Sequence, residues 1–298
     1  MKLLTVVRLT LAAILSVAAV STISARKKTP MKVMSYNLRY TNKIDTGVNT
    51  WAMRRQPSFD MIRDERPDII GFQEPRPDQM KDLKEGLGDV YGYYSAVEAG
   101  VEPRKSGYVA IMYLKDRFNL LDKGHFWLSP TPDVPSKPEW GAQDRQYRMT
   151  VWVKLFDKKA WRDVYFFTTH LPYKFPDNDA RAACSALNVE RMKKIAGQKS
   201  AVFITGDMNA SWAKSDTCRR SVAPYFRWMK GARETARVLT PDICSYNGFG
   251  TAENVPSWNL DHIFYRNIRP KEFDVIATDK YGVRYISDHY PITLTLEY

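Results

Sequence analysis

Val-Phe-Ile-Thr-Gly-Asp-Met-Asn, at residues 202–209, is the stretch that decides the fold class. The β-branched and aromatic run at 202–205 has the length and composition of a buried strand. Upstream, residues 177–197 combine an Asp-Asn start, apolar residues at helical spacing and a closing Gly, and this pattern predicts a helix. A helix that leads into a strand with Asp207 and Asn209 at its end is typical of an α/β protein.

Further runs of β-branched and aromatic residues have the same character. They lie at residues 33–36, 69–72, 109–113, 151–156, 164–169, 263–265 and 292–296. Helical patterns separate several of the runs, whereas strand follows strand directly between residues 93 and 156. This mixture predicts mixed, mainly antiparallel sheets covered by helices. The fold class that we expect is therefore α/β, in the form of a sandwich.

Composition excludes several classes of protein. Of the 298 residues, 44% are hydrophobic and 13% aromatic, which excludes a disordered, collagen-like or coiled-coil chain. The 45 Lys and Arg outnumber the 33 Asp and Glu, so the formal net charge is +12. Such a charge favours anionic substrates through long-range attraction. The basic residues form scattered doublets, so their pattern does not indicate whether the anionic substrate is nucleic acid, a phospholipid headgroup or a sugar phosphate.

Residues 1–25 differ in composition from the rest of the chain. They contain basic residues but no acid, an apolar run at 9–20 and small residues up to Ala25. This pattern predicts a signal peptide and hence an exported protein, periplasmic or secreted. An uncleaved anchor is the alternative, although the run is shorter than the ~20 residues of a membrane span. We expect a linker at 26–30, one domain at 31–298, no stable membrane insertion after cleavage, and no protein partner that the sequence can indicate.

Acids, amides and imidazoles stand where the predicted strands end or begin. They are Asn37, Glu74, His170, Asp207, Asn209, Asp261, Asp288 and His289. In α/β sheets, binding sites form outside the strand ends, so these side chains can converge in one cleft. Carboxylate and amide oxygens suit a hard cation such as Mg²⁺, which takes protein carboxylates together with substrate phosphate oxygens. The set therefore predicts metal-assisted attack of water on phosphorus, with Mg²⁺ as cofactor and Mn²⁺ as the alternative.

The segments around these residues also resemble the motifs of a known family in their order and spacing. They read Ser-Tyr-Asn-Leu-Arg at 35–39, Gly-Phe-Gln-Glu at 71–74, Thr-Thr-His-Leu at 168–171, Gly-Asp-Met-Asn at 206–209, Leu-Asp-His-Ile-Phe at 260–264 and Ser-Asp-His-Tyr-Pro-Ile at 287–292. The resemblance is to the endonuclease/exonuclease/phosphatase family, the deoxyribonuclease I-like phosphoesterases, and it spans the catalytic domain at 31–298. The stretch at 126–135 looks like secreted bacterial members. The resemblance implies a four-layer α/β sandwich, with two sheets face to face and helices outside.

The resemblance implies roles for the metal and water ligands. Glu74 would hold the divalent cation, and Asn37 and Asp288 would complete its shell directly or through water. Asp207 and Asn209 would orient and activate the attacking water. Asn37 and Asn209 would also contact the substrate phosphate.

Roles for the histidines follow from the same resemblance. His289, oriented by Asp261, would act as general acid or base or as a charge donor to the phosphoryl oxygens. His170 would bind the phosphate and stabilise its developing charge. Many relatives carry a Glu that orients this first histidine, and the present chain lacks it at the matching position. Glu98, Glu102, a water molecule or a backbone carbonyl would take its place.

Arg148 is the remaining candidate for phosphate binding. It lies between a Pro-rich stretch and a predicted strand, where a guanidinium fork could clamp a phosphate. The alternative interpretation of Arg148 is a solvated edge.

The function that we expect is that of an exported, Mg²⁺-dependent phosphoesterase. A phosphodiesterase with nuclease-like activity is the first choice, so nucleic acid is among the candidate substrates. Hydrolysis of a non-nucleotide phosphoester, such as a phospholipid headgroup, sphingomyelin or a sugar or inositol phosphate, is the alternative. A catalytically silent binding protein is a further alternative, since a fold by itself does not establish a function.

Overall fold

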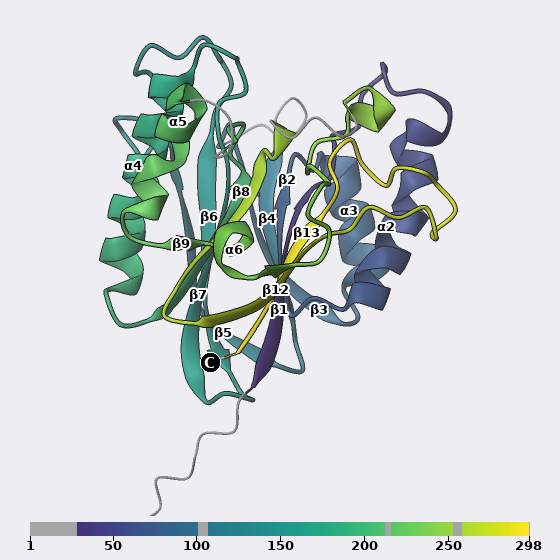
Figure 1. Ribbon diagram of the computed structural model, residues 1–298, viewed down its shortest axis with the longest axis horizontal. Helices are drawn as coiled ribbons and strands as arrows, with labels where there is room; N and C mark the ends of the chain where they lie inside the picture. The colour runs from purple at the N-terminus through teal and green to yellow at the C-terminus, as the bar shows by residue number, and fades with distance from the viewer. Residues whose placement is uncertain (1–28, 101–106, 212–215, 253–257, 298) are drawn as a thin grey trace, which may run out of the picture.

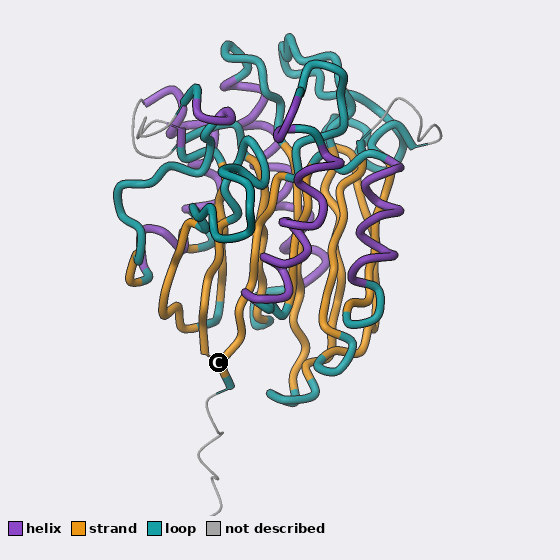
Figure 2. Tube along the Cα trace, turned by 90° about the vertical axis from the view of Figure 1, so that its right-hand side faces the viewer, coloured by secondary structure: helices purple, strands orange, loops and turns teal. Residues whose placement is uncertain are grey.

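The computed structural model describes residues 29–100, 107–211, 216–252 and 258–297. Within these residues two sheets pack face to face, and helices cover their outer surfaces (Figure 1). Seen from the side, the axes of the strands are roughly aligned, and many of the loops gather at one end of the sandwich (Figure 2). The four-layer arrangement that we predicted is thus confirmed. The predicted signal peptide lies outside the described residues, and within them no helix has the length and apolarity of a membrane span.

The first sheet has seven strands and combines parallel with antiparallel pairs. In spatial order they are β10 (Arg237–Val238), β12 (Arg269–Val275), β13 (Ile292–Glu297), β1 (Pro30–Asn37), β2 (Ile69–Gln73), β4 (Tyr108–Leu114) and β3 (Tyr91–Val97). The predicted boundary at residue 31 falls inside β1.

The second sheet has six strands, and its pairs are antiparallel except for β7 beside β8. In spatial order they are β5 (Phe118–Trp127), β6 (Met149–Asp157), β7 (Arg162–His170), β8 (Ala201–Asp207), β11 (Asp261–Arg266) and β9 (Lys230–Gly231). All the predicted strand runs are found in the two sheets.

Helices pack on the outside of each sheet. Two of them, α2 (Trp51–Glu65) and α3 (Pro77–Leu87), lie on the side of the first sheet, and α4 (Asn178–Ala196) and α5 (Asp216–Phe226) lie on the side of the second (Figure 1). The helix predicted at 177–197 is α4. Short helical turns complete the described chain: η1 (Gly47–Asn49), α6 (Ala232–Thr235) and η3 (Gly248–Gly250).

Strand β8 shows why the central runs are apolar throughout. Phe203 belongs to the core between the sheets, whereas Val202 and Ile204 belong to the core beneath α4 and α5. Successive side chains of a strand point to opposite faces, so a strand covered on both faces needs apolar residues at every position. The same alternation places Phe166 between the sheets and Phe167 beneath the helices.

Toward the loop-bearing end, the layer between the sheets becomes polar and narrow. Gln73 donates from Nε2 to Thr168 Oγ1 at 2.8 Å, and Thr205 Oγ1 lies 3.1 Å from Thr168 Oγ1. Gly71 of β2 faces these threonines, and a Cβ atom there would lie 2.2 Å from Thr205 Oγ1. The two sheets therefore approach each other closely at Gly71, where there is no room for a side chain.

Replacing Gly71 with Ala is expected to destabilise the fold. The added methyl must push the threonines of the second sheet aside, and overpacking of this kind costs about 1–3 kcal/mol. Urea unfolding of Gly71→Ala should show that loss, while Lys199→Ala on the exposed surface should not. Equal stability of Gly71→Ala and the unchanged protein would contradict the close packing of the sheets.

Candidate active site

Three of the predicted residues come from neighbouring strands of the second sheet. His170 ends β7 and Asp207 ends β8, and the two are paired in register. Asp261 begins β11 and pairs with Asp207 on its other side. Residues that are paired in register on neighbouring strands have side chains on the same face of the sheet. The side chains of His170, Asp207 and Asp261 therefore lie next to one another at one rim.

The first sheet contributes the remaining acids from its adjacent rim. Asn37 ends β1 and pairs with Gln73, the last residue of β2, so Glu74 follows directly beside it. Asp288 and His289 lie shortly before β13, where Ser287 Oγ donates to the carbonyl of Asn37 at 2.7 Å. The candidate site is therefore assembled across both sheets.

Backbone conformation re-aims two of these residues. Glu74 has a φ angle of 71° and Asn209 one of 47°, both in the left-handed region. Non-glycine residues in this region carry a strain of order 1–3 kcal/mol, and such strain clusters at functional sites. Each of the two lies just after a strand that reaches the site, so the turn directs its side chain back toward the strand ends.

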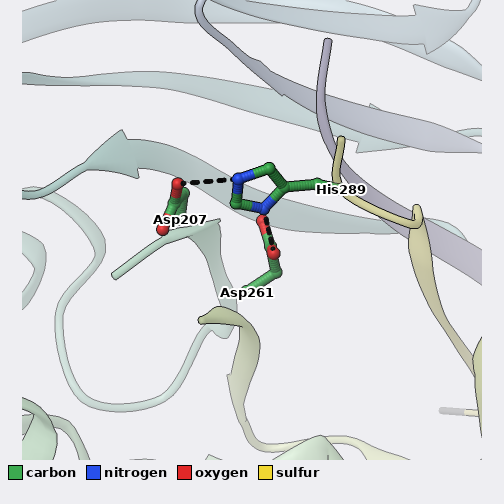
Figure 3. Close-up of side chains that lie close together, drawn as sticks. All are labelled: Asp207, Asp261 and His289. Atoms are coloured by element: carbon green, nitrogen blue, oxygen red, sulfur yellow. Dashed lines mark hydrogen bonds and ion pairs between the residues drawn. The ribbon is translucent and has the colours of Figure 1, made fainter. Parts of the chain in front are cut away.

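The imidazole of His289 lies between two carboxylates (Figure 3). Its Nδ1 lies 2.7 Å from Asp261 Oδ2, and its Nε2 lies 3.7 Å from Asp207 Oδ2. Burial alone would lower the pKa of His289, but the charges of Asp261 and Asp207 outweigh it and raise the pKa to about 10. The buried ring is therefore an imidazolium at neutral pH, with its Nε2 side turned toward Asp207.

Asp207 is the centre of the polar network. Its Oδ2 accepts a hydrogen bond from Asn37 Nδ2 at 3.0 Å and lies 3.5 Å from His170 Nε2. Its Oδ1 accepts from the backbone N–H of Asn209 at 2.9 Å. Burial raises the pKa of Asp207 to about 7, although His289 opposes the shift. The structure thus joins catalytic candidates from both sheets through one carboxylate.

Glu74 and Asp288 form the acidic part of the site that faces β1. Burial, and after it the charge of Asp288, raises the pKa of the Glu74 carboxyl. The backbone N–H of Tyr40 donates to Glu74 Oε2 at 3.1 Å, and Arg39 Nη1 lies 3.4 Å from Asp288 Oδ2. A half-buried carboxylate whose ionisation is opposed by a neighbouring carboxylate fits a hard divalent cation, which would favour the charged form of Glu74.

Asn37, the third predicted member of the metal set, has both ends of its amide engaged. Its Oδ1 accepts from the backbone N–H of Arg39 at 3.0 Å, and its Nδ2 bonds to Asp207. Within the described chain, Asp207, Asp261 and His289 form a second cluster with ligand atoms within 4.8 Å of one another, and there the imidazolium itself supplies the positive charge. The acids therefore stabilise positive charge in two places: a divalent cation would fit at Glu74 and Asp288, and the imidazolium of His289 lies beside Asp207.

A cavity of about 980 Å³ opens over these residues. Its lining includes Glu74, His170, Asp207, Asp288 and His289. Asp261 and Asn37 lie behind this lining, where they bond to His289 and Asp207.

Arg148 is on the cavity wall, so the interpretation as a solvated edge is wrong. Only 2% of the residue is exposed, and its Nε and Nη2 donate to Asp144 Oδ2 at 2.9 and 2.7 Å. Asp177, at the start of α4, in turn accepts from the backbone N–H groups of Gln143 and Asp144. The guanidinium is thus held rigidly beside the site, as a phosphate-binding group requires.

Sequence reasoning gave no role to an aromatic pair in the cavity lining. The rings of Tyr246 and Trp258 stack with centroids 4.8 Å apart, and the Tyr246 ring meets His289 edge-on at 4.9 Å. Both aromatic residues line the cavity. No strand pattern marks the loop that carries Tyr246, so its place beside His289 had no signal in the sequence.

His170 makes its side-chain polar contact with Asp207 rather than with Glu98, among the residues that the structure describes. Glu98 lines the same cavity, and burial raises its pKa to about 7 against the charge of Arg148. Glu102 lies outside the described residues. Burial, together with the charges of Arg148 and His289, lowers the pKa of His170 well below 6.5, so this ring is neutral at pH 7.

The contribution of His170 to the stability of the metal-free protein is expected to fall as the pH falls below 6.5, against the opposite contribution of carboxyls such as Asp207, whose pKa is raised in the folded state. In the unfolded chain this histidine binds a proton near its usual pKa, whereas the buried ring does not, so acid favours the unfolded state. Urea unfolding at about pH 7.5 and about pH 5.5 in EDTA should show that the unchanged protein becomes less stable relative to His170→Gln at the lower pH. An identical pH dependence of stability in the variant and the unchanged protein would contradict a buried neutral His170.

Comparison with known proteins agrees with this geometry. The model of the endonuclease/exonuclease/phosphatase family matches residues 34–289, which include every site residue named above. The chain belongs to this family. Its members are metal-dependent phosphoester hydrolases, and the chain is accordingly an enzyme of the endonuclease/exonuclease/phosphatase type.

Solved structures of the family resemble the chain over nearly its whole length. A Bacteroides vulgatus member is 27% identical, with a TM-score of 0.79, over 90% of this chain and 99% of that one. A Bacteroides thetaiotaomicron mannosyl-6-phosphatase is 29% identical, with a TM-score of 0.76, over 89% of this chain and 99% of its own.

Two uncharacterized proteins of Acanthamoeba polyphaga mimivirus are also similar to the chain. They are 26% and 25% identical over 81% and 90% of it. The chain spans 40% of the length of the first protein and 100% of the second.

Proposed function

We propose that the chain is an exported, Mg²⁺-dependent phosphoesterase that directs water onto the phosphorus of a compact phosphoester, with a sugar phosphate as the first candidate. The observation that carries the proposal is the Asp261–His289–Asp207 arrangement beside the acids Glu74 and Asp288. A fixed acid, a charged imidazole and a carboxylate pair around one cavity are the groups that metal-assisted phosphoester hydrolysis needs.

In this mechanism each side chain has one task. Asp207, oriented by Asn37 and by the backbone of Asn209, holds the attacking water and accepts its proton. The imidazolium of His289, held by Asp261, would face the phosphoryl oxygens and offset the charge that develops on them. As the bond between phosphorus and the leaving oxygen breaks, that oxygen takes up a proton from solvent water. Glu74 and Asp288 would hold the divalent cation, which supplies further charge neutralisation when bound.

The form of the cavity supports a compact substrate. Its volume of about 980 Å³ lies within the range of sites that enclose small ligands, ~300–1,000 Å³. Arg76, Lys137, Arg145 and Arg148 line it and attract an anionic group. The similar mannosyl-6-phosphatase is a precedent for a sugar phosphate as substrate of this fold.

Nuclease-like phosphodiester hydrolysis is the second candidate. It is favoured by the stacked pair of Tyr246 and Trp258 beside His289, because nucleic acid bases stack on aromatic rings of this kind. The excess of basic residues favours it as well.

A substrate panel separates the two candidates. The mature domain is incubated with mannose 6-phosphate, p-nitrophenyl phosphate, bis-p-nitrophenyl phosphate, sphingomyelin and single- and double-stranded DNA and RNA, in Mg²⁺, in Mn²⁺ and in EDTA. We expect EDTA-sensitive hydrolysis, fastest on the sugar phosphate. Faster cleavage of nucleic acid would replace the first candidate by the second, and EDTA-resistant hydrolysis would overturn the metal dependence.

Export is a separate part of the proposal and has its own measurement. The full chain is expressed in a bacterial host, and the mass of the product in the periplasm or medium is determined. Removal of residues 1–25 is the expected result, whereas an intact chain that stays with the membrane would favour the uncleaved anchor.

A further inference from the structure

Glu98 occupies a fixed position on the cavity wall, just after β3. Its backbone N–H donates to the carbonyl of Gly107 at 3.0 Å, and its own carbonyl accepts from Trp127 Nε1 at 2.7 Å. Trp127 belongs to the core between the sheets. These two hydrogen bonds fix the backbone of Glu98, so its side chain can move only by changing rotamer.

The side chain of Glu98 is largely buried and lines the cavity. The residue is 8% exposed, and no donor within the described part of the chain forms a hydrogen bond or ion pair with its side chain. Arg148 is close enough for its charge to act on Glu98, but two of its nitrogens donate to Asp144. Buried carboxylates are normally paired or hydrogen-bonded. Because Glu98 lines the cavity, its carboxylate can accept hydrogen bonds from the donor groups of a bound ligand.

The surroundings of Glu98 restrict the chemistry of those donors. An ammonium group is disfavoured, because the same cavity is lined by Arg76, Lys137, Arg145 and Arg148. A phosphate is disfavoured next to Glu98 itself by the like charge. Neutral hydroxyl groups remain, and a carboxylate can accept from two of them at once.

We propose that Glu98 is a specificity-determining residue that accepts hydrogen bonds from hydroxyl groups of the leaving group, and so selects phosphoesters of polyols. The inference rests on the proposed function and extends it to the part of the substrate that departs. Gly107 supports the assignment, since a Cβ atom there would lie 3.1 Å from Glu98 Oε2 and narrow the space beside the carboxylate.

Two substrates with different leaving groups test the inference. Mannose 6-phosphate presents several hydroxyl groups, whereas p-nitrophenyl phosphate presents none on its leaving group. Glu98→Gln should lower kcat/KM for mannose 6-phosphate by about 10–100-fold, because a site built for hydroxyl groups loses a charged acceptor. The value for p-nitrophenyl phosphate should change by less than about twofold.

Controls separate specificity from structural effects. Glu190→Gln, on the exposed face of α4, should leave kcat/KM for both substrates unchanged. Glu98→Asp keeps the negative charge but moves it back from the cavity by the length of one methylene group. It should also lower kcat/KM for mannose 6-phosphate selectively. Equal losses of activity on both substrates would indicate that Glu98 orients His170 or Arg148 and would overturn the inference, as would no loss on either. If the unchanged enzyme hydrolyses neither substrate in Mg²⁺, the proposed function fails and the inference fails with it.

Discussion

Replacing His289 with Ala is expected to lower kcat by about 10²–10⁴-fold, the range that a positioned acid, base or charge donor contributes. The ring has no substitute among its neighbours: Asp261 fixes its Nδ1, and its Nε2 is directed toward Asp207. The carboxylates that raise its pKa to about 10 keep it charged throughout the neutral range. The measurement is kcat on p-nitrophenyl phosphate in saturating Mg²⁺.

His125→Ala is the matched control for that measurement. His125 lies on β5, where its Nδ1 is 2.9 Å from the Tyr94 hydroxyl, and it does not line the cavity. This variant should retain kcat within about twofold, as expected of a residue that touches no reacting group. A His289→Ala enzyme with the kcat of the unchanged protein would refute the role of the imidazolium.

Asp207→Asn is expected to have the second large effect, again a loss of about 10²–10⁴-fold in kcat. The amide has the size of the carboxylate but loses the negative charge that accepts a proton. In addition, its NH₂ group would face the NH₂ group of Asn37, or else the backbone N–H of Asn209. Since both neighbours are donors, the variant also loses the hydrogen bonds that fix the network.

The control for Asp207→Asn is Asp163→Asn in the same sheet. Asp163 is a partly exposed residue of β7 that pairs with Lys154 at 2.9 Å and does not line the cavity, so its replacement should leave kcat unchanged. Circular dichroism of both variants should match that of the unchanged protein. An active Asp207→Asn enzyme, or an equal loss in Asp163→Asn, would contradict the central place of Asp207.

How much of the fold could be predicted depended on burial. Strands covered on both faces, such as β2 and β8, are buried at every position, and the continuous apolar runs with which they begin stand out in the sequence. The edge strand β5 has exposed charged residues in its middle, and α2 contains Pro57 within its helical turns. Their structure comes from pairing and packing with distant segments, which outweigh local preference.

The candidate site divides in the same way. Its acids, amides and imidazoles were predictable because each stands at the end or beginning of a strand, and strand ends meet at one rim. The buried pair of Arg148 with Asp144 and the position of Tyr246 against His289 depend on how loops fold over that rim. Local patterns contain no information on such contacts, so only the structure identifies them.

Because the sheets approach each other closely at Gly71, the activity of the enzyme should depend on the packing of the two sheets against each other. Each sheet by itself would carry only part of the reactive groups: Asn37 and Glu74 belong to one, His170 and Asp207 to the other. A compact intermediate that kept its helices and strands but let the sheets drift apart would retain its circular dichroism and lose turnover. Inactivation in denaturant should therefore precede or coincide with the loss of secondary structure, and never lag behind it.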